Sequence, residues 1–158
     1  MYYRPVKTND LESIYYLNES VLPHVNSVSH STIEKFMRIS SFFMVAKFKE
    51  EIAGFMIALG LGQDYKSENY IFFSKKYKSF EYVDRIVVKK KYEGMGIGRG
   101  FYEYLIKQSN AERITCEVNL HPPNPNSILF HQKVGFKEIG QLYIDGRKKK
   151  VSLMTLKI

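Results

Sequence analysis

The sequence predicts an α+β fold built on one mixed, mostly antiparallel sheet of about seven strands. Three observations lead to this prediction. Seven short apolar runs alternate with four stretches of helical periodicity, polar turns join neighbouring runs, and one helical stretch lies between two runs in the manner of a parallel crossover. At 158 residues the chain is long enough for one core, so we expect a single domain over residues 1–158.

Caps and turns define the elements of the first half. Thr8-Asn9-Asp10 offers cap residues for a first helix, and Ser31 with Glu34 resembles a capping box for a second. The polar turn Lys49-Glu50-Glu51 separates two apolar runs and predicts an antiparallel hairpin. The first strand belongs at a sheet edge, because Pro5 lacks an N–H. These signals predict strands at 2–7, 42–48 and 52–59 and helices at 11–18 and 31–39.

The second half begins with a strand, a glycine-rich loop and a helix. The glycines of the loop are Gly94, Gly96, Gly98 and Gly100. Asn126-Ser127 offers a cap for a later helix that Gly135 ends, and Asp145-Gly146 predicts the turn of a final hairpin. These signals predict strands at 84–88, 113–119, 136–144 and 150–158 and helices at 99–109 and 126–134.

Residues 63–81 show no clear period. They mix aromatic side chains with Lys66, Lys75, Lys76 and Lys78. We interpret this segment as a mobile wall of a substrate site. Two alternatives stay open, because the aromatic rings can also pack on the sheet or stack on single-stranded nucleic acid.

Composition excludes several classes of protein. Hydrophobic residues make up 44% and aromatic residues 15% of the chain, which excludes a disordered protein. The single cysteine, Cys116, excludes an internal disulfide and a cysteine-rich zinc site, and no other metal site is predicted. Because the sequence shows neither a signal-peptide pattern nor an apolar run of about 18 residues, we expect a cytoplasmic protein without a membrane anchor.

The charge of the chain indicates the kind of partner. A formal net charge of +8 predicts an acidic partner, such as a phosphorylated cofactor, an acidic substrate, nucleic acid or an anionic membrane. The basic residues are spread along the chain rather than gathered in a tail. This distribution counts against nucleic acid.

The glycine loop is suited to bind a phosphate group. Such a loop leaves backbone N–H groups unpaired at the start of a helix, with the positive end of the helix dipole behind them. Arg99 and Gly100 follow Gly98 where a P-loop requires Lys and Ser or Thr, and Phe101 stands where a dinucleotide fingerprint requires glycine. Taken alone, the loop is either an anion site of another kind or a turn without a ligand.

Two motifs follow one another along the chain. The first is a strand end at Val88 followed by Gly94-Met95-Gly96-Ile97-Gly98, and the second is Asn124-x-x-Ser127-x-x-Phe130-His131-x-Lys133-x-Gly135-Phe136. Both resemble motifs of the GNAT superfamily of acyl-CoA-dependent N-acyltransferases, and the order of elements is similar over essentially the whole chain. The resemblance implies helices on both faces of the sheet and a parallel fourth and fifth strand that splay apart.

The resemblance also implies an enzyme that transfers the acetyl group of acetyl-CoA to a primary amine by direct attack in a ternary complex, with coenzyme A as product. The fourth strand would pair with pantetheine, the Val88 N–H would polarise the thioester carbonyl, and loop amides would hold the pyrophosphate. Asn124 would hydrogen-bond the pantetheine arm, and Phe130 would pack near it. The implied cofactor-binding residues are Ile86, Val87, Val88, Gly94, Met95, Gly96, Ile97, Gly98, Arg99, Gly100, Asn124 and Phe130.

Three side chains are candidates for proton transfer. An alkylamine has a pKa of about 10, so a base must remove its proton at neutral pH. Glu117 is the first candidate base, because its strand resembles the Leu-Glu-Val-Arg strand of ribosomal-protein alanine acetyltransferases in this family, and Asp84 is the second. His131 is the candidate acid for the departing thiolate. Each has a structural alternative: an exposed or ion-paired strand residue for Glu117, a pair with Arg85 for Asp84, and a surface or packed histidine for His131.

The chain departs from the family pattern at three positions. Glu93 stands in place of Arg or Gln, Lys90 in place of a common proline, and His131 in place of tyrosine. Because Glu93 removes a favourable side chain near phosphate, we expect Arg99 and the lysines at 89–91 to compensate. The departures leave a non-catalytic acyl-CoA-binding module as the alternative function.

The acceptor stays open between a polyamine, an amino acid, an aminoglycoside and a protein amino terminus or lysine. The resemblance places the acceptor site at residues 20–40 and 63–80. These segments contain Glu34, Asp64 and Glu68, which can meet a cation, although the net positive charge of the chain is unfavourable for a polycation. A homodimer is compatible with the sequence.

Overall fold

The computed structural model describes all 158 residues. The strands are β1 (Tyr2–Pro5), β2 (Phe42–Phe48), β3 (Glu51–Gly60), β4 (Glu81–Val88), β5 (Arg113–His121), β6 (Lys137–Ile144) and β7 (Lys149–Lys157). The helices are α1 (Leu11–Glu19), α2 (His30–Ile39), α3 (Glu68–Lys76), α4 (Ile97–Gln108) and α5 (Pro125–Val134), with short 3₁₀ turns η1 (Thr8–Asp10) and η2 (Lys90–Tyr92). The strands pair in the order β1-β2-β3-β4-β5-β7-β6, and β4 and β5 pair in parallel. The predicted α+β class with a mixed, seven-stranded sheet is confirmed.

The chain forms two compact units. The first unit consists of residues 1–59 and 85–109, and the second consists of residues 60–84 and 110–158. Strand β4 passes from the second unit into the first after Asp84.

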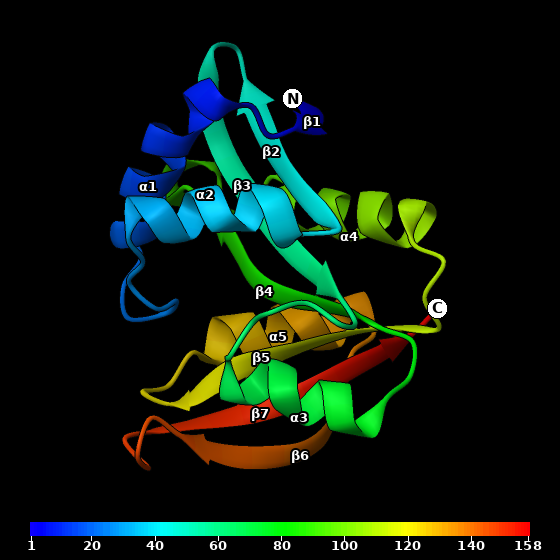
Figure 1. Cartoon of the computed structure of the whole chain (residues 1–158). Helices are drawn as coiled ribbons and strands as arrows, with labels where there is room; N and C mark the ends of the chain where they lie inside the picture. The colour runs from blue at the N-terminus through cyan, green and yellow to red at the C-terminus, as the bar shows by residue number, and fades with distance from the viewer. The chain divides into compact units, whose positions relative to one another are not determined.

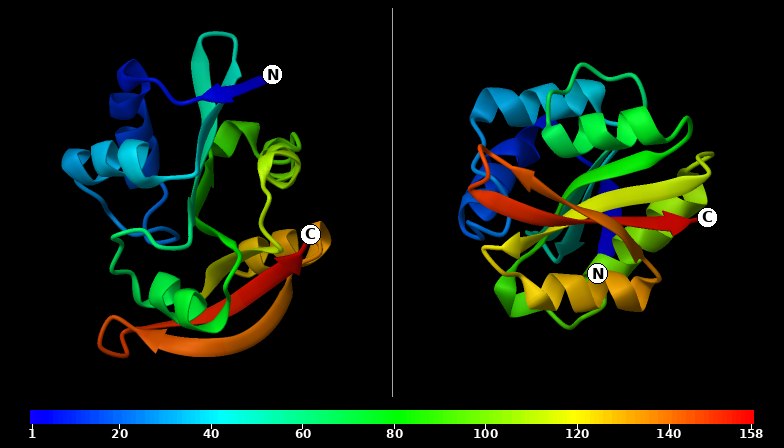
Figure 2. Two further views of the ribbon diagram at one scale, coloured as in Figure 1. Left: turned by 45° about the vertical axis from the view of Figure 1, so that its right-hand side comes forward. Right: turned by 90° about the horizontal axis from the view of Figure 1, so that it is seen from below.

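Strands β1, β2 and β3 of the first unit form an antiparallel ladder in which Tyr3 lies opposite Ala46 and Val45 lies opposite Phe55. In this unit, α1 and α2 lie on one face of the ladder and α4 lies on the other (Figures 1 and 2). The core of the unit includes Ile14, Phe36, Val45, Phe55 and Phe101, all of them buried.

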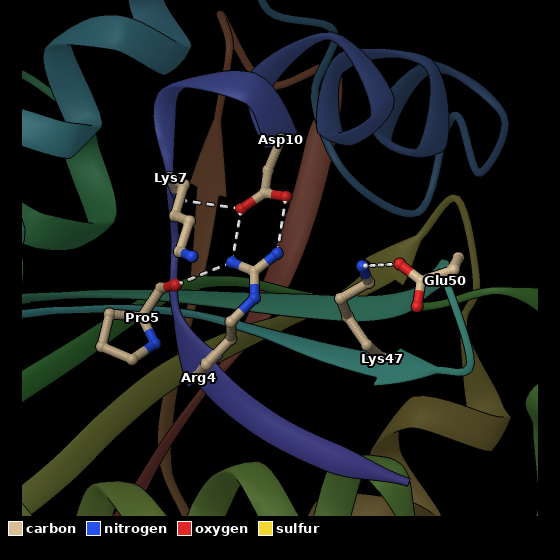
Figure 3. A network of polar contacts seen from close by, with 6 residues as sticks. All are labelled: Arg4, Pro5, Lys7, Asp10, Lys47 and Glu50. Carbon is tan, nitrogen blue, oxygen red and sulfur yellow. Dashed lines mark hydrogen bonds and ion pairs between the residues drawn. The ribbon is translucent and has the colours of Figure 1, made fainter.

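A polar network joins β1 to the start of α1 (Figure 3). Arg4 donates from Nη1 and Nη2 to the two carboxylate oxygens of Asp10, at 2.6 and 2.8 Å. The backbone N–H of Lys7 donates to the same carboxylate at 2.8 Å. Lys47 and Glu50 form a separate pair at 3.4 Å near the β2–β3 turn. The Asp10 carboxylate therefore ties the edge strand to the first helix.

In the second unit, β5 lies between β4 and β7. Parallel pairing with β4 covers the residue pairs Glu81–Ile114, Tyr82–Thr115 and Val83–Cys116. Antiparallel pairing with β7 runs along all of β5, and β6 completes the edge. Figure 2 shows α3 on one face of these strands and α5 on the other. Tyr70 and Phe73 of α3 pack against Tyr82 of β4, and all three side chains are buried.

Three local predictions are wrong. Residues 63–81 contain α3, which begins after Ser67, whose Oγ accepts a hydrogen bond from the Tyr70 N–H. Ser29, rather than Ser31 with Glu34, caps α2. Asn124, rather than Asn126 or Ser127, caps α5. For α2 and α5, the true cap lies two or three positions before the predicted one. No helix of the protein combines the length and the apolar character that crossing a lipid bilayer requires.

Candidate functional site

The glycine loop of the first unit has the geometry of an anion site. Gly94 and Gly96 have φ values of 77° and 78°, and Gly96 is the residue before α4. A side chain at either position would meet no atom within 4 Å, so glycine is required here by the backbone conformation. The first N–H groups of α4 have no intrahelical acceptor, and the positive end of the helix dipole lies behind them. These donors fit the pyrophosphate of coenzyme A.

Gly100 has a different role from the one predicted. Its N–H donates to the carbonyl of Gly96 at 2.9 Å inside the helix, so this amide is not available to a phosphate. A Cβ at position 100 would overlap the hydroxyl of Tyr3. That hydroxyl donates to the carbonyl of Ile97 at 3.1 Å. Glycine is needed at position 100 because β1 packs against α4 there.

The lysines near the loop also differ from the prediction. Lys89 and Lys91 form ion pairs with Glu51, the first residue of β3, and are therefore not simple counter-charges for a phosphate. Lys90 is exposed and Arg99 is 70% exposed, with Glu103 at 3.9 Å from its Nε. Of the cations expected to compensate for Glu93, Lys90 and Arg99 lie outside the ion pairs with Glu51.

The second unit places Glu117 beside Tyr82. Tyr82 pairs with Thr115 across the parallel strands, so Glu117, two residues further along β5, lies on the same face of the sheet. The Tyr82 hydroxyl donates to Glu117 Oε1 at 2.9 Å. Asp84, two residues after Tyr82, also belongs to this face. The two predicted bases are thus neighbours on one face, and both belong to the second unit.

The pKa of Glu117 is raised to about 8. Burial is the largest cause and the charge of Asp84 adds to it, while the hydrogen bond from Tyr82 and the Asn69 side chain on α3 act in the opposite direction. The second carboxylate oxygen, Oε2, is buried without a hydrogen-bond partner, and so is Oδ1 of Asn69. If Glu117 is protonated, its carboxyl gains an O–H group that can donate a hydrogen bond. At neutral pH the carboxyl is therefore mostly protonated, which suits a group that exchanges protons.

Tyrosines surround the two carboxyl groups. The Tyr65 hydroxyl donates to Asp84 in a short hydrogen bond. The pKa of Tyr82 is raised well above its usual value, first by burial and then by the charges of Glu117 and Asp84. Tyr70 packs against Tyr82 with ring centroids 5.5 Å apart, and its hydroxyl donates to the Gly60 carbonyl. The sequence analysis missed Tyr65, Asn69 and Tyr82. The alternation of β4 was the available signal, because it puts Tyr82 and Asp84 on one face.

The surroundings of His131 differ from those expected of the candidate acid. The ring is 3% exposed and lies between Phe130 and Phe136, with centroids at 5.0 and 5.4 Å. Its Nδ1 lies 2.7 Å from the Ser127 carbonyl oxygen, which can only accept, so Nδ1 carries the hydrogen. Burial lowers the pKa of His131, so the ring is neutral at pH 7. A packed histidine, the alternative to an imidazolium acid, is what the structure favours.

Asn124 and Phe130 both belong to the second motif, at the start and in the middle of α5. The Asn124 side-chain oxygen accepts from the Ser127 N–H at 3.4 Å and so caps α5. Its side-chain amide can still donate to a pantetheine carbonyl. Phe130 is half-buried beside His131.

The aromatic residues of segment 63–81 do not form a stacking platform for nucleic acid. Tyr70, Phe73 and Phe80 are buried. Tyr77 is covered by Arg113, whose guanidinium lies 4.1 Å from the ring centroid. The alternative in which these rings pack on the sheet is therefore the correct one for the buried members.

Solved structures show where this fold occurs. NAA60 from Arabidopsis thaliana in complex with a bisubstrate analogue matches with a TM-score of 0.80 and 18% identity, over 99% of this chain and 97% of that one. The ribosomal-protein-S18-alanine N-acetyltransferase from Escherichia coli matches with a TM-score of 0.74 and 17% identity, over 99% and 93%. The putative acetyltransferase yncA from Salmonella typhimurium, solved with acetyl-CoA, matches with a TM-score of 0.73 and 17% identity, over 99% and 93%.

Sequence comparisons match the chain to a family model but to no individual curated protein. No curated protein sequence matches the chain significantly. The family model described as Acetyltransferase (GNAT) family matches residues 10–136, which is most of the chain and includes both motifs. The chain therefore belongs to the acetyltransferase (GNAT) family, and the predictions of an acetyltransferase and of acetyl-CoA as its cofactor are confirmed at the level of the family.

Proposed function

We propose that this protein transfers the acetyl group of acetyl-CoA to the α-amino group of a peptide or protein, with Glu117 as the general base. The observation that carries the proposal is the buried Glu117 carboxyl, which accepts from Tyr82 at 2.9 Å and has its pKa raised to about 8. The similar structures add support, because the Escherichia coli protein is by name a ribosomal-protein-alanine acetyltransferase.

The pKa of the base favours an α-amino group over a lysine. An α-amino group has a reference pKa of about 7.7 to 8.0, and a lysine side chain has one of about 10.4. A base with a pKa of about 8 accepts the proton of an α-ammonium group at almost no cost in free energy. The same transfer from lysine is unfavourable by about 3 kcal/mol. The net charge of +8 also disfavours polyamines and aminoglycosides.

Residues of the first unit would bind the cofactor. Acetyl-CoA supplies the acetyl group as a thioester that an uncharged amine can attack. The amides from Met95 to Arg99 would hold the pyrophosphate, and the backbone from Ile86 to Val88 would hold the pantetheine arm, where the Val88 N–H could polarise the thioester carbonyl.

Proton transfer belongs to the second unit. Ionised Glu117 accepts the amine proton, Tyr82 orients the carboxyl, and the charge of Asp84 keeps the pKa of Glu117 high. The same carboxyl can return the proton to a departing thiolate, because a thiol has a reference pKa of about 8.5. An additional acid at His131 is then unnecessary.

The test uses peptides that differ only in which amine is free. Each peptide carries one lysine and is offered with a free or a blocked amino terminus, and mass spectrometry locates the acetyl group. We expect acetylation of the free amino terminus by the wild type and its loss in Glu117→Gln. The matched control is Glu112→Gln, which changes an exposed glutamate near the start of the same strand.

Acetylation of lysine or of a polyamine, with none at the amino terminus, would contradict the proposed acceptor. Failure of the wild type to bind coenzyme A in calorimetry would contradict the cofactor site. The non-catalytic alternative requires coenzyme A binding without turnover of any amine, and no observation favours it.

Three finer points belong to the same proposal. Residues 1–158 act as one acetyltransferase domain, because the family model spans both units. The acceptor contacts residues 20–40 and 63–80, as the resemblance implies. A cytoplasmic location and a homodimer stay predictions.

A further inference from the structure

We propose that Glu51 is a positioning residue for coenzyme A, because its carboxylate fixes the turn that leads into the glycine loop. The inference rests on the proposed function in one respect, that the glycine loop holds the pyrophosphate. It assigns a role to a side chain on β3, a strand that neither motif includes.

Three side chains converge on Glu51. Lys89 forms a short ion pair with Oε1. Lys91 lies 2.5 Å from Oε2, and the Tyr92 hydroxyl donates to the same oxygen at 2.6 Å. Both carboxylate oxygens are thus engaged by residues at the two ends of η2.

A backbone hydrogen bond joins the first end of η2 to β3. The Lys89 N–H donates to the Ala53 carbonyl at 2.8 Å, which joins the turn to β3. Within the turn, the Tyr92 N–H donates to the Lys89 carbonyl at 2.8 Å. At the second end, the Glu93 N–H donates to the Lys90 carbonyl at 3.2 Å within the turn. Side chains join this end to β2 and β3, through Glu51 and through the ring of Phe48, whose centroid lies 5.6 Å from that of Tyr92. Gly94 follows two residues later, so the direction of the loop depends on these side chains.

Glu51 is charged whenever the protein is folded near neutral pH. Hydrogen bonds from Lys89, Lys91 and Tyr92 lower the pKa of Glu51 to about 2. The Glu51 side chain is 35% exposed, so solvent and salt screen these ion pairs in part. The two lysines therefore serve the turn rather than the phosphates of the cofactor.

Replacement of Glu51 has two opposite effects on coenzyme A binding. The sign of the net change in affinity shows whether Glu51 positions the loop. Loss of the carboxylate frees the end of η2, which weakens coenzyme A binding at any salt concentration. It also frees the charges of Lys89 and Lys91, which strengthens binding at low salt only. A positioning residue is indicated by weaker binding that persists at high salt.

The experiment measures the Kd of coenzyme A by calorimetry at about 50 mM and about 300 mM salt, across which screening of surface charges changes strongly. We expect Glu51→Gln to raise the Kd by about tenfold at about 300 mM salt, similar to the loss on removing a partner that orients a metal ligand. The rise at about 50 mM is expected to be smaller, because the freed lysine charges offset part of it. Tyr92→Phe removes one of the three contacts and is expected to give a smaller increase. Glu50→Gln is the matched control, because Glu50 is the preceding residue, is 99% exposed and pairs only with Lys47 among the charged groups.

A kinetic measurement separates positioning from general loss of structure. For Glu51→Gln, the KM for acetyl-CoA is expected to rise with the Kd, while the KM for the peptide acceptor and the thermal midpoint stay close to wild type. An unchanged Kd, or binding that is tighter at low salt, would overturn the inference. If Glu51→Gln does not fold, an unchanged Kd for Tyr92→Phe overturns the inference equally. A wild type that does not bind coenzyme A contradicts the proposed function instead.

Discussion

The hydroxyl of Tyr82 donates to Oε1 of Glu117 at 2.9 Å, between two parallel strands of the second unit. The bond supplies one donor to a buried carboxyl whose other oxygen has none. A carboxylate in that position is poorly solvated, so the neutral form is favoured until the pH approaches 8. Burial thus raises the pKa of Glu117, and the contact with Tyr82 offsets part of that rise.

Activity is expected to rise with pH as Glu117 ionises. Because the carboxyl must lose its proton before it can accept one, kcat/KM for an α-amine acceptor should increase through a midpoint near the pKa of about 8 and then level off. Glu117→Gln should lower kcat by about 10²- to 10⁴-fold, the usual contribution of a general base. Initial rates of thiol release across the pH range measure both.

Glu117→Gln should also change how the stability of the protein depends on pH. The folded-state pKa of Glu117 lies above its unfolded value, so the contribution of this group to stability is complete below about pH 4.5 and is lost as the pH rises through about 8. Glu117→Gln should remove that loss, and its thermal midpoint should fall less than that of wild type between pH 6 and pH 9.

A wild-type reaction rate that does not depend on pH across this range would contradict the assignment of Glu117 as the general base.

Tyr82→Phe should move the pH–rate midpoint to higher pH. The variant removes the donor that stabilises the ionised carboxylate, so the pKa of Glu117 increases and the activity at pH 7 falls. The shift, rather than the rate alone, identifies the contact, because a packing defect would lower the rate without moving the midpoint. Tyr143→Phe, which removes an exposed hydroxyl in the same unit, serves as the control.

Asp84→Asn should move the midpoint in the opposite direction. The charge of Asp84 raises the pKa of Glu117, so its removal lets Glu117 ionise at lower pH. If Asp84 were instead the base, the variant would lose most of its activity at every pH and would leave no midpoint to follow. The two outcomes distinguish the first candidate base from the second.

Asp10→Asn should destabilise the first unit by about 1 to 3 kcal/mol, the usual range for hydrogen bonds to charged groups. The hydrogen bonds from Arg4 lower the pKa of Asp10. Its contribution is therefore present above the ordinary carboxyl pKa and is lost as the pH falls below about 4. Urea unfolding at pH 7 and pH 3 should show a difference between variant and wild type at pH 7 that shrinks in acid. Glu50→Gln, which breaks the exposed pair with Lys47 in Figure 3, should change stability by less than about 0.5 kcal/mol.

Gly54→Ala should destabilise the fold, because the added Cβ would lie 2.6 Å from the carbonyl oxygen of Val87. The backbones of β3 and β4 must then separate, at a cost of about 1 to 3 kcal/mol. Gly60→Ala is the matched control on the same strand, since a Cβ there meets no atom within 4 Å. Equal unfolding midpoints for the two variants would show that the close approach is not required.

Most of the fold could be predicted because its signals are local. The apolar run at 42–48 and the strand–glycine–helix order around position 96 each specify an element without distant contacts. Helix α3 was missed because Tyr70 to Phe73 is an unbroken apolar run, which hides the helical period that buries Tyr70 and Phe73. Glu117 was chosen by resemblance, not by its surroundings.

The environment of the site could not be predicted in the same way. The contact between Tyr82 and Glu117 joins residues 35 positions apart and depends on the register of two parallel strands. The burial of His131 depends on how α5 packs, although the flanking Phe130 and Phe136 gave a partial signal. Charges near the glycine loop were misread for a related reason, because Glu51 approaches Lys89 only through the pairing of β3 with the strand end.

The contact between Tyr3 and Gly100 restricts how the sequence can change. The ring of Tyr3 occupies the space that any larger residue at position 100 would need, and its hydroxyl donates to the carbonyl of Ile97 at the start of α4. Positions 3 and 100 should therefore vary together among related proteins, with glycine at 100 wherever an aromatic hydroxyl stands at 3. A truncation of β1 would act on coenzyme A binding from a distance, without removing any atom of the loop itself.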